Sequence, residues 1–209
     1  RPAARPGARR PAAAPPAAER WLRLAVALGD EGPDPEAFLR LVDLLVNTGR
    51  AAEVQALMQR YQWDLFSEKS LAYQRGDWRQ IYRMHLALGM TYAHMKVWTS
   101  ATPYQNAVFQ LENAERAATR FNDAAQRQGR PERLALPPAA VAKLDEAYRA
   151  VGRVDQATAL RLRSAEQLQR FERPLDAAQV LATFTAGEVA ALSAASRTRF
   201  ARLRSTLPN

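Results

Sequence analysis

The amino-acid sequence predicts an all-α protein, and three observations support this prediction. Apolar residues recur at helical spacing along most of the chain, and glycine and proline stand where these patterns end or begin. The apolar content is led by Ala and Leu, which favour helices, whereas Ile, which favours strands, occurs only once. With 209 residues, 47% of them hydrophobic, the chain can bury a core. We therefore expect an array of antiparallel helix hairpins in a single helical domain over residues 19–209, preceded by an extended arm.

The arm is expected to span residues 1–18. These residues are only Arg, Pro, Ala and Gly, and the prolines remove backbone donors and block a helix. A segment without a core of its own becomes ordered most readily against another molecule. We therefore expect this Pro/Ala/Arg-rich arm to contact a partner.

The start of the chain and the lack of cysteine bear on its compartment. The sequence begins at Arg1 rather than Met and contains no Cys. A removed export signal, a cleaved anchor or an omitted stretch would each explain this start, and the first slightly favours a periplasmic or exported protein over a cytoplasmic one. No apolar stretch approaches the roughly 20 residues of a membrane span, so we do not expect the given sequence to be transmembrane.

The first helix is expected to begin at Glu19 and to end at Gly29. Trp21, Ala25 and Leu28 lie at i, i+4 and i+7, which places them on one face of a helix. The chain should therefore enter its helical domain with an amphipathic segment.

A helix hairpin is expected over residues 35–61. Asp34 is followed by Pro35, a pattern typical of an N-cap and the first helical position. Gly49 should end the first helix, and a second helix with an apolar face should follow at once. The short connector predicts that the two helices lie side by side.

The middle of the domain is expected to hold a longer hairpin over residues 64–128. One helix should run over residues 64–74, a second over 78–96 and a third over 102–128. A turn at Gly76-Asp77 should separate the first two of these helices, and Gly129 with Pro131 should end the third.

Aromatic residues concentrate between residues 61 and 109, and two interpretations are open. They could fill gaps between long helices, or they could form an exposed docking patch, because Trp, Tyr and Arg dominate protein-binding hot spots. Aromatic residues near helix ends are more often left partly exposed. We therefore expect Trp63, Trp98 and Tyr104 to contribute to a protein-binding patch.

The last part of the domain is expected to contain a hairpin over residues 138–171 and further helices over residues 174–205. Pro174 should open a short helix. Thr185 and Glu188 match a capping box, which should start the final helix.

The charge of the chain is strongly basic, with a formal net charge of +9. Attraction to nucleic acid, anionic lipid or an acidic protein is one interpretation, and a coding bias that favours Arg on solvated helix faces is the other. The same choice applies to the basic C-terminus, where an acidic partner or solvent would face one set of side chains: Arg197, Arg199, Arg202 and Arg204.

One segment, residues 144–157, resembles a tetratricopeptide repeat. Leu144 is followed by Tyr148, then by Gly152 and Ala157, at the spacing of that family's two helices and their tight turn. The physical logic is independent of the family. The first two side chains stack at i and i+4, the glycine permits the turn, and the small alanine allows a close approach.

Two other segments resemble the repeat less closely. One has Leu88-Gly89 with Tyr92, Trp98 and Ala101, and the other has Phe38, Leu41, Leu45 and Gly49. The three units would start near residues 35, 82 and 138, farther apart than the family's period of about 34 residues. The resemblance implies an irregular array with a concave surface for peptide or protein ligands, and no enzymatic activity.

The sequence offers few groups for catalysis or metal binding. The only two histidines, His85 and His94, are too far apart to share a metal at i, i+4 spacing. Glycines occur singly, and the serines lack a nearby constellation of His or Lys residues that could activate a nucleophile. We therefore expect no cofactor, no metal and no enzymatic activity; a hydrolase or metal enzyme would need a constellation that the linear order hides.

The functional hypothesis is a non-catalytic scaffold or accessory subunit of a larger assembly. Its partners would be other protein subunits, contacted by the arm and the helical surface, and the assembly could be membrane-associated with this chain peripheral. The alternative is a basic nucleic-acid-binding protein, whose affinity would fall steeply with salt. Nucleic acid is the less favoured partner because the aromatic residues are not interleaved with basic ones.

Overall fold

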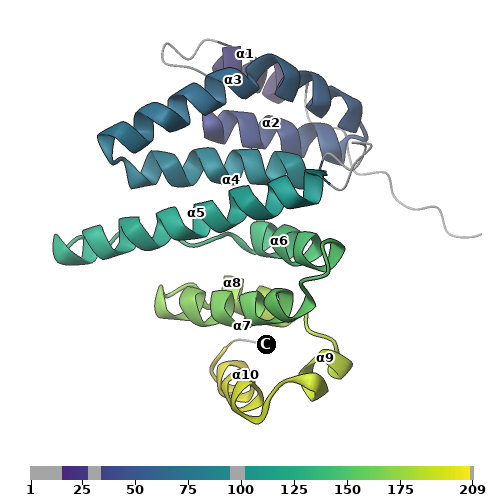
Figure 1. The fold of residues 1–209 in the computed structure, drawn as a ribbon, viewed down its shortest axis with the longest axis vertical. Helices are drawn as coiled ribbons and strands as arrows, with labels where there is room; N and C mark the ends of the chain where they lie inside the picture. Colours follow the sequence, from purple (N-terminus) through teal and green to yellow (C-terminus); the bar gives the residue numbers. More distant parts are fainter. Residues whose placement is uncertain (1–15, 28–33, 95–101, 208–209) are drawn as a thin grey trace, which may run out of the picture.

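The computed structural model describes residues 16–27, 34–94 and 102–207, and within these residues the secondary structure is entirely α-helical. Figure 1 shows the helices stacked along the longest axis, with α1–α3 at one end and α9 and α10 at the other. The helices are α1 (Pro16–Ala27), α2 (Pro35–Asn47), α3 (Ala51–Arg75), α4 (Trp78–His94), α5 (Thr102–Arg127), α6 (Pro138–Ala150), α7 (Val154–Arg170), α8 (Pro174–Leu181), α9 (Ala186–Ala191) and α10 (Ala194–Thr206). The all-α prediction is confirmed.

The helices pack in sequence order and also across every second helix. Each helix from α1 to α7 contacts the helix that follows it. In addition, α2 contacts α4, α4 contacts α6, and α6 contacts α8. In the described part of the chain, α3, α5 and α7 form no comparable series of contacts. The even-numbered helices therefore form one continuous side of the stack.

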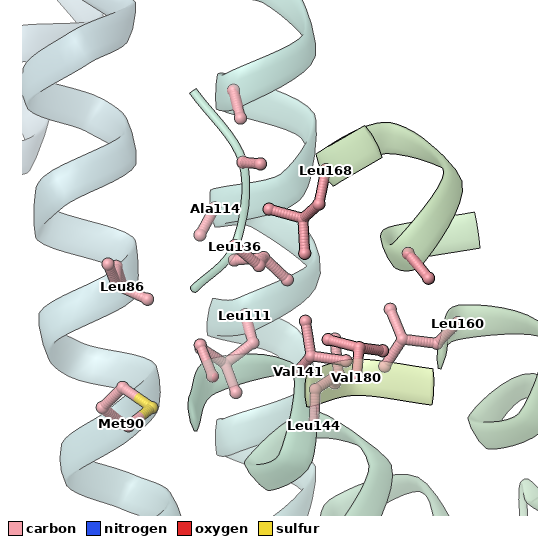
Figure 2. Packing of buried hydrophobic residues seen from close by; sticks show 14 of the residues in the cluster. Leu86, Met90, Leu111, Ala114, Leu136, Val141, Leu144, Leu160, Leu168 and Val180 are labelled. Carbon is pink, nitrogen blue, oxygen red and sulfur yellow. The ribbon is translucent and has the colours of Figure 1, made fainter. Parts of the chain in front are cut away.

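The core consists of two clusters of buried side chains, and α4 contributes to both. Met84 and Leu88 pack with the buried residues of α1–α3, whereas Leu86 and Met90 pack with those of α5–α8. Figure 2 shows the second cluster, in which side chains from α4 to α8 meet. Because both sides of α4 are covered, this helix joins the N-terminal and C-terminal parts of the stack.

Helices α4 and α5 approach each other closely at Gly89. A Cβ atom added to Gly89 would lie 2.6 Å from Leu111 Cγ and 3.1 Å from its backbone nitrogen. Real Cβ atoms do not come so close, so only glycine permits this packing. The glycine of the second repeat-like segment thus has a definite structural role.

Caps and turns explain the ends of the first helices. The Asp34 side chain accepts hydrogen bonds from the backbone nitrogens of Glu36, at 2.7 Å, and Ala37, at 3.0 Å. Pro35 occupies the first helical position, and Gly49 adopts the left-handed conformation after the helix, with φ of 78°. The predicted start and end of this helix are both confirmed.

The boundaries differ from the predicted ones in three places. Helix α1 begins at Pro16, so residues 16–18 are helical rather than part of an extended arm, and the rest of that arm lies outside the described residues. A proline at the first helical position is tolerated because its missing N–H would have no partner there. Second, the predicted break between residues 61 and 64 is absent, since α3 is one helix of 25 residues.

The third difference concerns the C-terminus, where one long helix was expected after Thr185. The capping box is present: the Thr185 backbone nitrogen donates to Glu188 and the Glu188 nitrogen donates to the Thr185 hydroxyl. However, α9 ends after six residues, and Ser193 then caps α10. The break reorients the chain so that Leu203, 2% exposed, packs into the main core.

Candidate functional site

The predicted aromatic patch is only partly placed by the structure. Trp63 belongs to α3, but its side chain lies outside the described part of the chain, as does the whole of Trp98. Tyr104, in the first turn of α5, is half-buried and packs against the main core. Packing therefore accounts for the one member of this patch that can be examined.

The basic C-terminus is divided between intramolecular contact and solvent. Arg199 forms an ion pair with Glu166 of α7, and its Nε donates to Glu166 Oε1 at 2.7 Å. The other three predicted residues, Arg197, Arg202 and Arg204, are exposed. The burial of Leu203 explains this arrangement, because it turns the opposite side of α10 outward.

A hollow of about 410 Å³ lies among α6, α7, α8 and α9. Its apolar wall is formed by residues of α6 and α8, and its polar wall by charged residues from α6, α7 and α9. The lining residues are Pro138, Ala139, Val141, Ala142, Asp145, Arg149, Arg161, Gln179, Val180, Thr183, Thr185 and Glu188. This combination of an apolar wall with a few converging polar groups is typical of binding sites.

Arg161 organises the polar wall of the hollow. Its side chain is only 4% exposed, and it pairs with Glu188 (Nη2 to Oε1, 2.6 Å) and with Asp145 (Nε to Oδ1, 2.9 Å). The guanidinium also lies 4.1 Å above the centre of the Phe184 ring. A buried charge is tolerated only when it is paired, and these contacts supply the pairing from two helices, α6 and α9, and from an aromatic ring.

A second arginine completes the network. Arg149 pairs with Asp145 at 2.8 Å and with Glu188 at 2.6 Å, so each carboxylate faces both guanidinium groups. The hydrogen bond from Arg161 is the main reason that the pKa of Glu188 falls to about 2. The two acids and two arginines balance in charge, and their side chains are held in fixed positions by one another.

One atom of this network lacks a hydrogen bond. Arg161 Nε is buried and has no partner with hydrogen-bond geometry among the described residues, although Asp145 Oδ1 lies at ion-pair distance. The same guanidinium donates from Nη1 to the Thr183 carbonyl at 3.0 Å. Because Arg161 Nε is buried beside Asp145, it stabilises the network through its charge and does not face the hollow.

The two histidines lie in different environments. His85 is 2% exposed, and its ring connects Gln110 Oε1, 2.6 Å from Nδ1, with the Tyr73 hydroxyl, 2.9 Å from Nε2. Because an amide oxygen only accepts, Nδ1 holds the proton and Nε2 accepts from the hydroxyl. Burial lowers the pKa of His85 to about 4, so the ring is neutral near pH 7. His94 Nε2, by contrast, lies 3.7 Å from Asp43 Oδ1.

Searches over the described residues found no group of three or more His, Cys, Asp or Glu side chains placed to hold a metal ion. They also found no helix with the length and apolar content needed to cross a membrane. Comparison of the chain with protein-family models, with curated proteins and with solved structures returned no match.

Sequence reasoning missed the residues around the hollow. Glu188 was recognised only as part of a capping box, and Arg161 stands between two leucines in a helix with no sign of burial. The one available signal was that Arg161 follows Leu160 by one position and Ala157 by four, which places it beside the apolar face of its helix. Its partners come from α6 and α9, so only the tertiary structure brings them together.

Proposed function

We propose that this protein is a non-catalytic helical scaffold that binds a segment of another protein, as an accessory subunit of a larger assembly. The observation that supports this most directly is the hollow among α6–α9. Its apolar wall can accept a side chain, and its polar wall presents groups that are already held in place. Pre-positioned groups lower the entropic cost of binding.

The order of helix contacts supports a tetratricopeptide-like array of antiparallel hairpins. In such arrays the first helix of each unit contacts the first helix of the next, which is the relation among α2, α4, α6 and α8. The units would begin at Pro35, Trp78, Pro138 and Pro174, so only the last interval is close to the family's period of about 34 residues. The lengthened α3 and α5 account for the irregular intervals.

The chemistry of the hollow favours a peptide over a nucleic acid. The charges of Arg149 and Arg161 are balanced by those of Asp145 and Glu188, so the polar wall has no surplus positive charge for phosphate. An apolar side chain could pack near Val180 in the apolar wall. An extended segment with an apolar residue is therefore the expected ligand.

The test uses the full chain in a selection from a displayed peptide library, followed by anisotropy measurements on the selected peptides. Ala142→Trp fills the hollow from the exposed side of α6, and we expect it to weaken binding at least tenfold, a change of about 1.4 kcal/mol. Ala150→Trp adds the same side chain to an exposed position of the same helix that does not line the hollow, and should change little.

Two outcomes would contradict the proposal. One is a selection that yields no peptide bound by the folded chain. The other is an equal effect of the two tryptophan substitutions, which would show that the hollow is not the binding site. Co-purification from the native source under mild conditions, repeated with both variants, would then identify the partner.

A further inference from the structure

Helix α1 presents an apolar face to solvent. Trp21 is 72% exposed and Leu24 is 37% exposed, and with Ala17 they lie at i, i+4 and i+7 along one side of the helix. Val26, only 2% exposed, packs into the N-terminal core together with the half-buried Leu22. The helix therefore has two apolar sides, of which packing within the chain uses one.

Ion pairs fix α1 on the body of the protein with this face turned outward. Arg23 pairs with Glu53 of α3 at 2.7 Å, and Glu19 pairs with Arg50 at 2.6 Å. The charge left beside the exposed face is that of Arg20, which lines a hollow of about 510 Å³ with Ala17, Trp21 and Leu24. Figure 1 shows that α1 lies at one end of the long axis, where the end of the stack can approach a flat surface.

The sequence before α1 adds positive charge next to this face. Arg1, Arg5, Arg9 and Arg10 precede it, and the first acidic residue of the chain is Glu19, whose charge is paired. These arginines precede the helix in the sequence and add to the attraction of the chain to any anionic surface. The partner of this face should therefore be anionic and able to accept a tryptophan side chain.

We propose that α1 binds an anionic lipid surface, with Trp21 and Leu24 at the boundary between headgroups and acyl chains and with Arg20 near the lipid phosphates. An indole ring is favoured at this depth of a bilayer. Apolar insertion and a basic cluster are the two signals that together give stable peripheral binding, and each basic residue adds to the attraction.

Charge and area favour a lipid surface over the other occupants of this face. A second copy of the chain would bring two Arg20 side chains together, which like-charge repulsion opposes. A stable protein interface buries about 800 Å² on each partner, more than two large side chains supply. A bilayer needs no complementary shape and accepts a narrow apolar stripe.

The experiment is co-sedimentation of the full chain with vesicles of phosphatidylcholine alone or with about 30% phosphatidylglycerol. We expect binding to the anionic vesicles only, with a partition coefficient that falls as salt increases. Trp21→Ser should lower the partition coefficient about tenfold. Leu175→Ser removes a side chain that is 74% exposed on α8, away from α1, and should leave binding unchanged.

Tryptophan fluorescence gives a second measurement. Insertion of Trp21 should shift the emission to shorter wavelength when anionic vesicles are added, and Trp21→Phe should abolish the shift while leaving most of the binding. Absence of vesicle binding, or equal loss in Trp21→Ser and Leu175→Ser, would overturn the proposal. So would a concentration-dependent dimer that Trp21→Ser dissociates, because the face would then belong to a second copy. Since Ala142→Trp does not touch α1, peptide binding and vesicle binding can fail independently.

Discussion

Replacement of Gly89 tests the packing of α4 on α5. In an isolated helix, Gly→Ala stabilises by about 1 kcal/mol, because glycine loses more backbone freedom on folding. In this protein the added Cβ would lie 2.6 Å from Leu111 Cγ and 2.7 Å from its Cδ2. Carbon atoms in contact are normally about 3.5–4.0 Å apart, so the two helices would have to separate by about 1 Å.

The two effects have opposite signs, and their difference can be estimated. Overpacking of a core by one methyl group costs about 3 kcal/mol at the upper end of the usual range, and a nearby backbone nitrogen limits relaxation here. After subtraction of the helix-propensity gain, Gly89→Ala should destabilise by about 2 kcal/mol. For a chain of this size that lowers Tm by about 4–8 °C.

The assay is urea unfolding followed by far-ultraviolet circular dichroism, with Gly187→Ala as the matched control. A Cβ added to Gly187 in α9 would meet no atom within 4 Å, so alanine there should raise the free energy of unfolding by about 0.5 kcal/mol. In Leu111→Ala the clash is removed, and the double variant should cost about 1–2 kcal/mol less than the sum of the two single changes. If Gly89→Ala were as stable as the parent protein, the close approach of α4 and α5 would be refuted.

Three further predictions concern buried polar groups. Tyr82→Phe should destabilise by about 1–2 kcal/mol in the same unfolding assay, because the hydroxyl donates to the buried Ala135 carbonyl at 2.7 Å; an unchanged midpoint would contradict this. His85 should titrate near pH 4 when followed by NMR. Because the fold favours the neutral ring, the stability of the protein should fall as the pH drops from 6.5 towards 4. A measured pKa near 6.5 would show instead that the ring is solvated. The fold lowers the pKa of Glu188 from 4.5 to about 2, so the stabilisation from its charged form should be present above pH 4.5 and lost as the pH falls towards 2. Glu188→Gln should remove this part of the dependence of stability on pH. If stability depended on pH in the same way in this variant, the pair between Glu188 and Arg161 would be contradicted.

The two proposed surfaces lie in different parts of the stack. Helix α1 is at one end of the long axis, and the hollow among α6–α9 is towards the other end (Figure 1). A chain arranged in this way could hold a partner at a distance from a lipid surface. Helix α4, whose side chains contribute to both core clusters, joins the two parts of the stack that carry these surfaces.

The sequence alone determined the helical class and most of the helix ends. Capping by Asp34, the proline at the start of α8 and the turn at Gly76 are encoded within a few residues, so local patterns predict them. The turn glycine Gly152, with φ of 78°, is likewise confirmed where the repeat-like segment required it. Local preferences suffice for these features because caps and turns satisfy their hydrogen bonds with near neighbours.

Tertiary structure decided the features that depend on contacts between distant segments. Helix α3 continues through residues 61–64, where a break was expected, and Met58 and Leu65 on either side of that point both pack into the N-terminal core. The ion pairs of Arg161 and the approach of Gly89 to Leu111 join residues that are at least 16 positions apart in the sequence. Periodicity shows which side of a helix is apolar, but it does not show which helix covers that side. The free energy of burial depends on that pairing, and the exposed face of α1 is a case in which two apolar sides existed and the fold covered only one.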